Sequence, residues 1–357
     1  MLLLLLACSA PFSTIATERG MGPPSGRDTS PPPTDSDPPP VDTVDSRPPP
    51  DTDPGGDTQV DTADTAPPPP PPPLRVAVIS DLNSSYGSTT YRAEVEAAMD
   101  ALVADPPDLV LSTGDMVAGQ KSGLDYGAMW AAFHATVSDP IASVGVPFAI
   151  TPGNHDASDY AGYENERDEY AAAWADRVPD VEMVDDTDFP FRYAFVQNDV
   201  LFVSLDDTLV GALSTEQRDW LSTVLDHPAS ARIIFGHVPL YPVAVGRETE
   251  ALFDEDLETL LVEKGVTAFI SGHHHAYYPG KRGPLRLIAT SCLGDSARAL
   301  IGTTTNSPRS ILRLVIDGGA ITELEAWTGT SFSAIIARDD LPTSVGSGGD
   351  TITRDDL

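Results

Sequence analysis

The sequence predicts an α/β protein whose parallel sheet is covered by helices on both faces, and two observations carry this prediction. Short apolar runs of strand length alternate with runs of helix length over residues 74 to 327, which is the pattern of parallel strands joined by crossover helices. Clusters of Asp, Asn and His follow several of the apolar runs directly. Because open α/β sheets bind ligands at the carboxyl ends of their strands, we expect a site there.

The first half of this region alternates most regularly. We expect strands at 74–80, 108–112 and 146–150, and helices at 91–104, about 124–137 and 164–175. In the first helix Val95, Met99 and Leu102 share one face. Asp105-Pro106-Pro107 should end that helix, since proline cannot continue it.

The second half is less regular. Two runs around Asn198-Asp199 predict a β-hairpin, because this dipeptide suits a tight turn. Ser214 followed by Gln217 predicts a capping box at the start of a helix. We expect the hairpin strands at 192–196 and 200–205, further strands at 232–235, 266–270, 285–289, 311–316 and 321–327, and a helix containing Phe253, Leu257, Leu260 and Leu261.

Composition divides the chain into four parts. Residues 1–8 are apolar and end in Cys8, and residues 9–73 are rich in Pro, Asp and Thr. The second part cannot bury enough apolar surface to offset its chain entropy, so we expect a disordered, semi-rigid spacer. Residues 74–330 are long enough for one α/β domain. Residues 331–357 are polar and Gly-rich, and we expect a tail.

The start of the chain resembles a lipid-attachment signal. Leu5-Leu6-Ala7-Cys8 is similar to the lipobox of bacterial lipoproteins, in which the cysteine is lipidated. A signal peptide normally has a basic start and a longer apolar core, so either the true start lies upstream or the match is chance. With a long spacer after it, we expect a lipid anchor at Cys8 and a location in the cell envelope or outside the cell. Cys292 would then have no partner, and we interpret it as a packing residue.

The charge of the chain narrows its partners. Residues 1–73 hold three arginines and eleven carboxylates, so residues 74–357 carry −25 of the total net charge of −33. A surface this acidic repels a nucleic-acid backbone, which needs basic side chains. We therefore expect no nucleic-acid polymer as partner, and membrane contact only through the lipid on Cys8.

The polar clusters form an ordered set. They read Asp81-x-Asn83, Gly114-Asp115, Gly153-Asn154-His155-Asp156, Gly236-His237 and Gly272-His273-x-His275. Singly, an Asp after a strand is usually a turn former or helix cap. Together these residue types are enough to ligate two metal ions. The set resembles the calcineurin-like metallophosphoesterase superfamily, which includes purple acid phosphatases and cyclic-nucleotide phosphodiesterases, over about residues 75 to 275.

The resemblance implies a fold and a chemistry. The fold is a four-layer α/β/β/α sandwich of mixed sheets, with metal ligands on loops at the strand ends. The chemistry is hydrolysis of a small phosphoester, a mono- or diester, by two metal ions (Mn, Fe or Zn) with a bridging hydroxide as nucleophile. One ion would take Asp81, Asp115 and His275, and the other would take Asp115, Asn154, His237 and His273. His155 would donate a proton or contact phosphate, with Asp156 orienting it.

Two positions depart from the family pattern, and two more are weaker candidates. Asn83 stands where many members have His, and its amide oxygen is a weaker, harder ligand that can loosen the first metal site. Ala118 stands where purple acid phosphatases have a metal-binding Tyr, which argues against an iron–tyrosinate site. His274, between two expected ligands, and Arg298 are candidate substrate contacts.

Two other interpretations remain open at this point. The chain could be a surface-anchored binding module that keeps the fold and has weak or no catalysis, and Asn83 is its best support. The three consecutive histidines could instead form a single structural zinc site. That hypothesis leaves the order of Asp115 and Asn154 after their own strands unexplained.

Overall fold

The structure is a computed structural model, and it describes residues 71–357. The predicted lipobox at 1–8 and nearly all of the predicted spacer at 9–73 lie outside the described residues. Their anchoring role and the location of the protein therefore stay predictions. No helix within residues 71–357 has the length and apolar character needed to cross a membrane.

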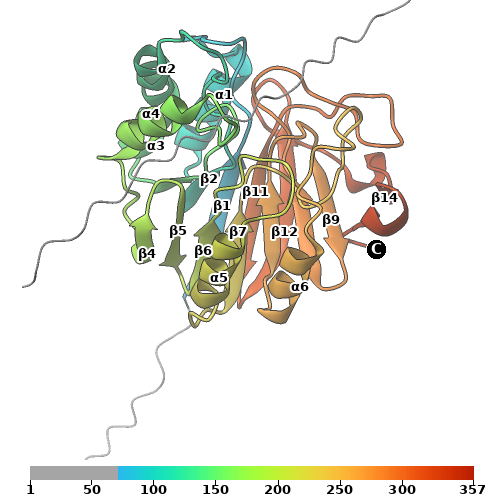
Figure 1. Ribbon diagram of the computed structural model, residues 1–357. Helices are drawn as coiled ribbons and strands as arrows, with labels where there is room; N and C mark the ends of the chain where they lie inside the picture. Colours follow the sequence, from blue (N-terminus) through green and yellow to red (C-terminus); the bar gives the residue numbers. More distant parts are fainter. Residues whose placement is uncertain (1–70) are drawn as a thin grey trace, which may run out of the picture. The chain divides into compact units, whose positions relative to one another are not determined.

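Two mixed sheets form the centre of the fold (Figure 1). Sheet A has the strand order β13 (Ala334–Ile335), β12 (Ala320–Thr328), β11 (Ser310–Asp317), β1 (Leu74–Ile79), β2 (Leu109–Ser112), β3 (Phe148–Ile150). Sheet B has the order β14 (Ser344–Val345), β15 (Ile352–Arg354), β9 (Tyr278–Arg282), β10 (Leu285–Ala289), β8 (Ala268–Ser271), β7 (Ala231–Phe235), β6 (Val200–Ser204), β5 (Arg192–Gln197), β4 (Glu182–Asp188). The neighbours β1, β2 and β3 are parallel, as are β6, β7, β8 and β10. Antiparallel β11 pairs with β1, and antiparallel β5 and β9 flank the second run on both sides.

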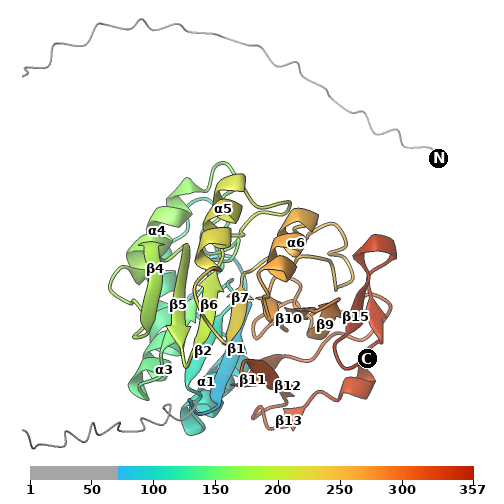
Figure 2. The ribbon, with the colours of Figure 1, turned by 90° about the horizontal axis from the view of Figure 1, so that it is seen from below.

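Three apolar clusters show that the layers stack as α/β/β/α. Val78 of β1 and Ile233 of β7 belong to one cluster, which lies between the two sheets. Met99 and Trp130 pack helices onto the outer face of sheet A, and Leu257 packs a helix onto sheet B. Figure 2 shows α5 and α6 on one side of the sheets and α1 and α3 on the other. The four-layer sandwich implied by the resemblance is confirmed.

The expectation of one parallel sheet with helices on both faces was wrong. Each sheet has helices on its outer face only, because its inner face packs against the other sheet. A fully buried strand is apolar on both faces whether a helix or a second sheet covers it. The apolar runs therefore identified the strands without identifying what covers them.

The helices largely match the predicted ranges. They are α1 (Ala93–Ala104), α2 (Tyr126–Phe133), the π-helical turn η1 (His134–Ser138), α3 (Asp139–Ser143), α4 (Glu164–Trp174), α5 (Thr215–Val224) and α6 (Glu255–Glu263). The helix predicted to end at 137 continues through η1 into α3, whose first turn contains Pro140. Ser214 Oγ accepts from the Gln217 N–H at 3.1 Å. The Gln217 side chain instead bonds both backbone groups of Asp206, so only half of the capping box forms.

Before the C-terminal segment, two strands had not been predicted. Strand β4 is mostly acidic and lies at the edge of sheet B, where exposed charges discourage pairing with another molecule. Strand β9 contains Pro279 and Gly280, which ordinarily argue against a strand. The hairpin between β5 and β6 is confirmed, and Asn198 and Asp199 have the positive φ angles of 48° and 63° that its tight turn requires.

The polar tail predicted at 331–357 is instead folded. Strand β13 pairs with β12 at the edge of sheet A, and after the 3-10 turns η2 (Arg338–Asp340) and η3 (Gly348–Asp350), β15 pairs with β9 of sheet B. Val345, Ile352 and Arg354 are buried. The Arg354 guanidinium donates to the carbonyl oxygens of Arg338 and Leu341. Few apolar residues are enough here, because the segment gains its backbone partners from sheet edges that already exist.

Candidate metal centre

The predicted ligands lie on loops that directly follow parallel strands. Asp81 follows β1, Asp115 follows β2, Asn154 follows β3, His237 follows β7, and the three histidines follow β8. The carboxyl ends of these strands meet at one edge of the two sheets, which is where ligand sites of α/β folds lie. The expected placement of these residues at the strand ends depends only on the order of the strands, and the structure agrees with it.

Four of these residues have left-handed backbones, which non-glycine residues adopt rarely. Their φ angles are 49° for Asp81, 55° for Asp115, 64° for His273 and 53° for His275. The backbone hydrogen bond from Asp81 N to the Gly114 carbonyl, 3.0 Å, ties the first two loops together. Strained backbones of this kind cluster at functional sites because the surrounding structure enforces them.

Glycines let the loops approach one another. A Cβ at Gly153 would lie 2.1 Å from the backbone nitrogen of Asp115, and a Cβ at Gly272 would lie 2.3 Å from Ser80 Oγ. Both distances are far below contact distance. The glycine that stands just before a predicted ligand therefore serves close packing of the loops, in addition to any freedom it gives the backbone.

The ring of His237 lies at the centre of the site and is fully buried. Its Nε2 atom is 3.0 Å from Asn154 Oδ1, 3.4 Å from Asp115 Oδ1 and 3.2 Å from His273 Nδ1. Asp81, Asp115 and His237 each offer a ligand atom, and these three atoms lie within 4.8 Å of one another. The spacings of 3.0–3.4 Å match the separation of neighbouring ligands around a cation with bonds of about 2.1 Å.

The hydrogen-bond pattern leaves several donor atoms facing one another. His237 Nδ1 faces the Thr113 carbonyl at 2.8 Å, and a carbonyl can only accept, so Nδ1 carries a proton and Nε2 is the nitrogen that faces the other donor atoms. Burial, and then the neighbouring His237, hold the pKa of His273 well below its usual range, so the His273 ring is neutral. One N–H could serve only one of the three neighbours of His237 Nε2. Converging lone pairs of this kind fit a metal ion.

A second group of donors surrounds Asp81. His275 Nε2 lies 3.1 Å from Asp81 Oδ1, and His275 Nδ1 lies 3.1 Å from the Ser296 carbonyl. Burial raises the pKa of Asp81, but the facing His275 and other donors outweigh it and lower that pKa to about 2. A carboxylate this buried needs a positive partner. The donors around Asp81 therefore also suit a cation.

Asn83 and Ala118 lie beside the site without joining the donor cluster. The Asn83 side chain donates to the Val117 carbonyl at 3.3 Å, and its backbone N–H donates to the Asp115 carbonyl. Ala118 is buried, and its carbonyl accepts from the Gly87 N–H. The contacts of Asn83 therefore stabilise the Asp115 loop, and metal ligation by its carbonyl oxygen stays a prediction.

The expectation that Asp156 orients His155 is corrected. The Asp156 carboxylate accepts three backbone N–H groups, from Met116 at 2.8 Å, Val117 at 2.9 Å and Gly153 at 2.9 Å. Burial, followed by the charge of Asp115, raises the pKa of Asp156 well above its usual range. Asp156 therefore joins the second and third loops, and its adjacency to His155 in the sequence does not become a side-chain contact.

Replacing Asp156 by Ala should strongly destabilise the fold. Three buried N–H groups would lose their acceptor, at a cost on the order of 3 kcal/mol or more. We expect a lower midpoint in urea unfolding of the metal-free full chain. The exposed Asp168 on α4 offers a matched control, and D168A should leave the midpoint unchanged. Equal midpoints for both variants would contradict this account.

His155 lies at the wall of an open cavity. Its Nδ1 lies 3.2 Å from the Gly119 carbonyl, so Nε2 is the nitrogen left for a ligand. The half-buried ring lines a cavity of about 300 Å³ together with Asn154 and His273. The structure thus brings His155 to the same space as two predicted ligands, with one ring nitrogen available.

The two weaker candidates lie outside this cavity. His274 is fully buried, and its nitrogens face the Val243 N–H at 3.1 Å and the Glu250 carbonyl at 2.7 Å. Burial, then the charge of Arg247, lowers its pKa to about 3. His274 is therefore a packing residue, and the substrate contact expected of it is wrong. Arg298 is half-buried and is not among the cavity-lining residues.

Three residues that sequence reasoning missed support the site. Asp207 Oδ1 accepts the backbone N–H of His237 at 2.6 Å. Arg247 and Glu250 line the cavity and pair with each other, and Glu250 Oε2 is 3.3 Å from His273 Nε2, though not aligned for a hydrogen bond. For Arg247 and Glu250, the only sequence signal is that a charged stretch follows His237 in the same loop. For Asp207 the signal is its place directly after β6.

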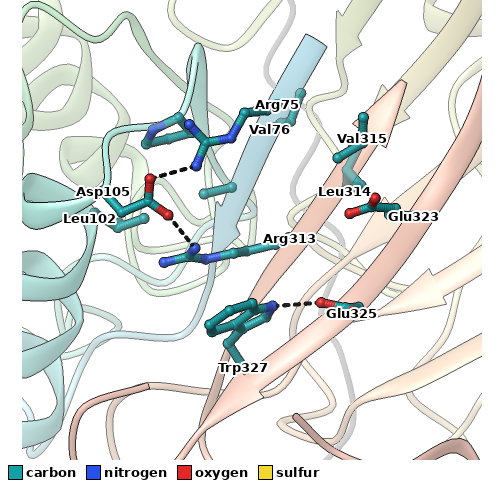
Figure 3. Close-up of a pocket in the computed structure, with 12 residues that line it drawn as sticks. Arg75, Val76, Leu102, Asp105, Arg313, Leu314, Val315, Glu323, Glu325 and Trp327 are labelled. Atoms are coloured by element: carbon teal, nitrogen blue, oxygen red, sulfur yellow. Dashed lines mark hydrogen bonds and ion pairs between the residues drawn. The ribbon is translucent and has the colours of Figure 1, made fainter. Parts of the chain in front are cut away.

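A second hollow lies away from these residues. It has a volume of about 200 Å³ and lies at the amino end of β1, between Arg75 and Trp327 (Figure 3). Three of its charged groups pair with one another, since Asp105 accepts from Arg75 at 2.8 Å and from Arg313 at 2.9 Å. The predicted ligands follow the opposite, carboxyl end of β1. We therefore assign this hollow no part in the site.

Comparison with known proteins places the chain in a family. Residues 74–277, which include every predicted ligand, match the calcineurin-like phosphoesterase family. The fold is similar to that of a purple acid phosphatase from yellow lupin (Lupinus luteus) seeds, at 19% identity and a TM-score of 0.56, covering 74% of this chain and 52% of that one. This chain thus spans about half the length of the lupin enzyme. It is also similar to GAP50, the anchor in the inner membrane complex of Plasmodium, at 16% identity and a TM-score of 0.50, covering 74% and 87% of the two chains.

No curated protein sequence matches the chain. The structural likenesses, at under 20% identity, show the fold alone. The family match covers more than half of the chain and contains the whole donor cluster. The chain therefore belongs to the calcineurin-like phosphoesterase family.

Proposed function

We propose that the chain hydrolyses small phosphoesters at a dinuclear metal centre built from the converging loops. The observation that carries this proposal is the position of His237 Nε2, which faces three other donor atoms at 3.0–3.4 Å, more than a single N–H could serve. The proposed ligands of the two ions are Asp81, Asp115, Asn154, His237, His273 and His275, with Asn83 adjacent.

Asp115 is the natural bridge between the two groups of donors. Its Oδ1 lies 3.4 Å from His237 Nε2, and its main chain holds Leu82 and Asn83 through the Asp115 carbonyl. Asp115 thus lies between the donors around Asp81 and the donors around His237. When bound, two cations neutralise the charge on phosphate oxygens and supply a hydroxide nucleophile at neutral pH.

Outer contacts fix the ligands. His237 and His275 each present one nitrogen to a backbone carbonyl, of Thr113 and Ser296 respectively, which leaves the other nitrogen for a metal. Gln120 Oε1 accepts from Asn154 Nδ2 at 3.1 Å, so the carboxamide oxygen of Asn154 points toward His237. Such outer-shell partners typically change metal affinity or activity by about 10–100-fold.

His155 is the proposed proton donor to the departing alcohol. Gly119 holds Nδ1, and Nε2 is free on the cavity side, as the role requires. H155N should lower kcat by about 10²–10⁴-fold for an alkyl phosphate, which has a poor leaving group. The loss should be much smaller for 4-nitrophenyl phosphate, which needs no proton. An equal loss on both substrates would show that His155 only positions the phosphate.

The test of the function is direct. The full chain is stripped of metal, reloaded separately with Mn, Fe or Zn, and assayed on 4-nitrophenyl phosphate and on its diester, bis(4-nitrophenyl) phosphate. We expect turnover that tracks a metal content of two ions per chain. Two ions per chain with no turnover under any metal would overturn the proposal and favour the binding module instead.

A further inference from the structure

The mouth of the cavity beside His155 gathers exposed apolar side chains. Three aromatic side chains are exposed within residues 71–357, and two of them, Tyr86 at 55% and Tyr160 at 42%, line this cavity. Val210, 39% exposed, lines it as well, whereas the third aromatic residue, Phe253, does not. Large apolar side chains held in water at the rim of a polar site mark a place where a ligand covers them.

Both tyrosines stand on turns with fixed backbones. Beside Tyr86, the Gly87 N–H donates to the Ala118 carbonyl at 3.0 Å. The Tyr160 backbone N–H donates to Ser158 Oγ at 3.2 Å, and its carbonyl accepts from the Tyr163 N–H at 3.2 Å. The rings therefore project from pre-formed loops, so that a ligand meets them without ordering these backbones.

The place of Tyr86 identifies which part of the substrate it would meet. Its ring lies against the His155 ring, with centroids 5.6 Å apart. In the proposed reaction His155 faces the leaving oxygen, so a side chain that touches His155 borders the leaving group. The charged groups of the cavity, Arg247 and Glu250, come from the loop after β7, whereas the tyrosines come from the loops after β1 and β3.

The polar groups near the tyrosines are already engaged. Gln120 Nε2 donates to Ser158 Oγ at 3.1 Å, while its Oε1 accepts from Asn154. Thr208 Oγ1 accepts from the Asp159 N–H at 3.2 Å. These bonds use part of the hydrogen-bonding capacity of both side chains, whereas the exposed apolar surface of the mouth comes from the two tyrosines and Val210. Recognition at this mouth therefore depends mainly on flat apolar contact.

From these contacts we propose that the enzyme prefers phosphoesters whose leaving group carries a flat aromatic ring, held at the cavity mouth by Tyr86 and Tyr160. The proposal rests on the proposed phosphoesterase function and specifies its substrate class. The ring can be a simple arene or a nucleobase, since both present the same apolar face to a tyrosine.

Two matched substrate pairs test this with the metal-loaded full chain. Benzyl phosphate is compared with cyclohexylmethyl phosphate, and a nucleoside 5′-monophosphate with ribose 5-phosphate. Within each pair the ester is that of a primary alcohol, and the difference lies in the aromatic ring. The variants are Y86A, Y160A and their combination, with Y86F and Y160F, which keep the ring. F253A removes an exposed aromatic residue outside the cavity and serves as the control.

We expect kcat/KM to favour the aromatic member of at least one pair. Each alanine variant should reduce that preference by about fivefold, the phenylalanine variants should retain it, and F253A should not change it. A preference for benzyl phosphate alone identifies a simple arene as the favoured leaving group. A preference for the nucleoside 5′-monophosphate alone identifies a nucleobase. Turnover of all four substrates without preference, or a preference that survives in the double variant, overturns the proposal. Absence of turnover on all four substrates, and also on 4-nitrophenyl phosphate and its diester, contradicts the phosphoesterase function instead.

Discussion

Replacing Asp115 by Asn should lower kcat/KM by more than about a hundredfold. This loss is larger than that expected for a residue that only contacts a metal ligand. The amide keeps the size of the side chain and can still accept the His155 N–H, now 2.9 Å from Oδ1. It has no negative charge with which to hold two cations close together. We therefore expect the metal content to fall from two ions per chain to one, with kcat/KM on an aryl phosphate falling in parallel.

D168N is the control for this experiment, since Asp168 is an exposed carboxylate on α4. It should keep both the metal content and the activity of the unsubstituted protein. Circular dichroism of D115N should match that of the unsubstituted protein, which separates loss of metal from loss of fold. Two tightly bound ions and unchanged turnover in D115N would refute the bridging role.

The second large effect is on stability. His237 Nε2 lies 3.0 Å from Asn154 Oδ1 and 3.2 Å from His273 Nδ1. A cation bound at this place would be ligated by these atoms together. At a free metal concentration one hundred times the Kd, binding to the native state alone should stabilise the protein by about 2.7 kcal/mol. Scanning calorimetry of stripped and reloaded protein should therefore show a clear rise in Tm.

H237A should lose most of that rise while remaining folded without metal, since its backbone N–H still donates to Asp207. His227, which lies in the loop before β7 and outside the donor cluster, provides the matched control, and H227A should keep the full metal-dependent increase. Because the experiment measures Tm, it tests the metal site without any knowledge of the substrate. An unsubstituted protein with the same Tm in both forms would contradict a built metal site.

The donor cluster was predictable from the sequence because every member follows the carboxyl end of a strand. The carboxyl ends of parallel strands meet at one edge, so Asp115 and Asn154 approach each other whatever the lengths of the intervening helices. The glycines before them, such as Gly153, were visible in the motif, and the structure shows that they permit the close approach.

The rest could not be predicted, for physical reasons that differ from case to case. The division into two sheets was missed because an apolar strand is equally well buried by a helix or by a second sheet. The role of Asp156 was missed because neighbours along a loop need not face the same way. Its carboxylate faces the backbone of Met116 and Val117, which only the folded arrangement of the loops reveals. Glu250 reaches His273 across 23 positions in the chain, and no local pattern records such a contact.

The pairing of β15 with β9 has a practical consequence for anyone producing this enzyme. A gene that stops before residue 344 would leave β9 as an open edge of sheet B, and an open edge invites pairing between molecules. Such a shortened protein should precipitate even though the catalytic loops are intact.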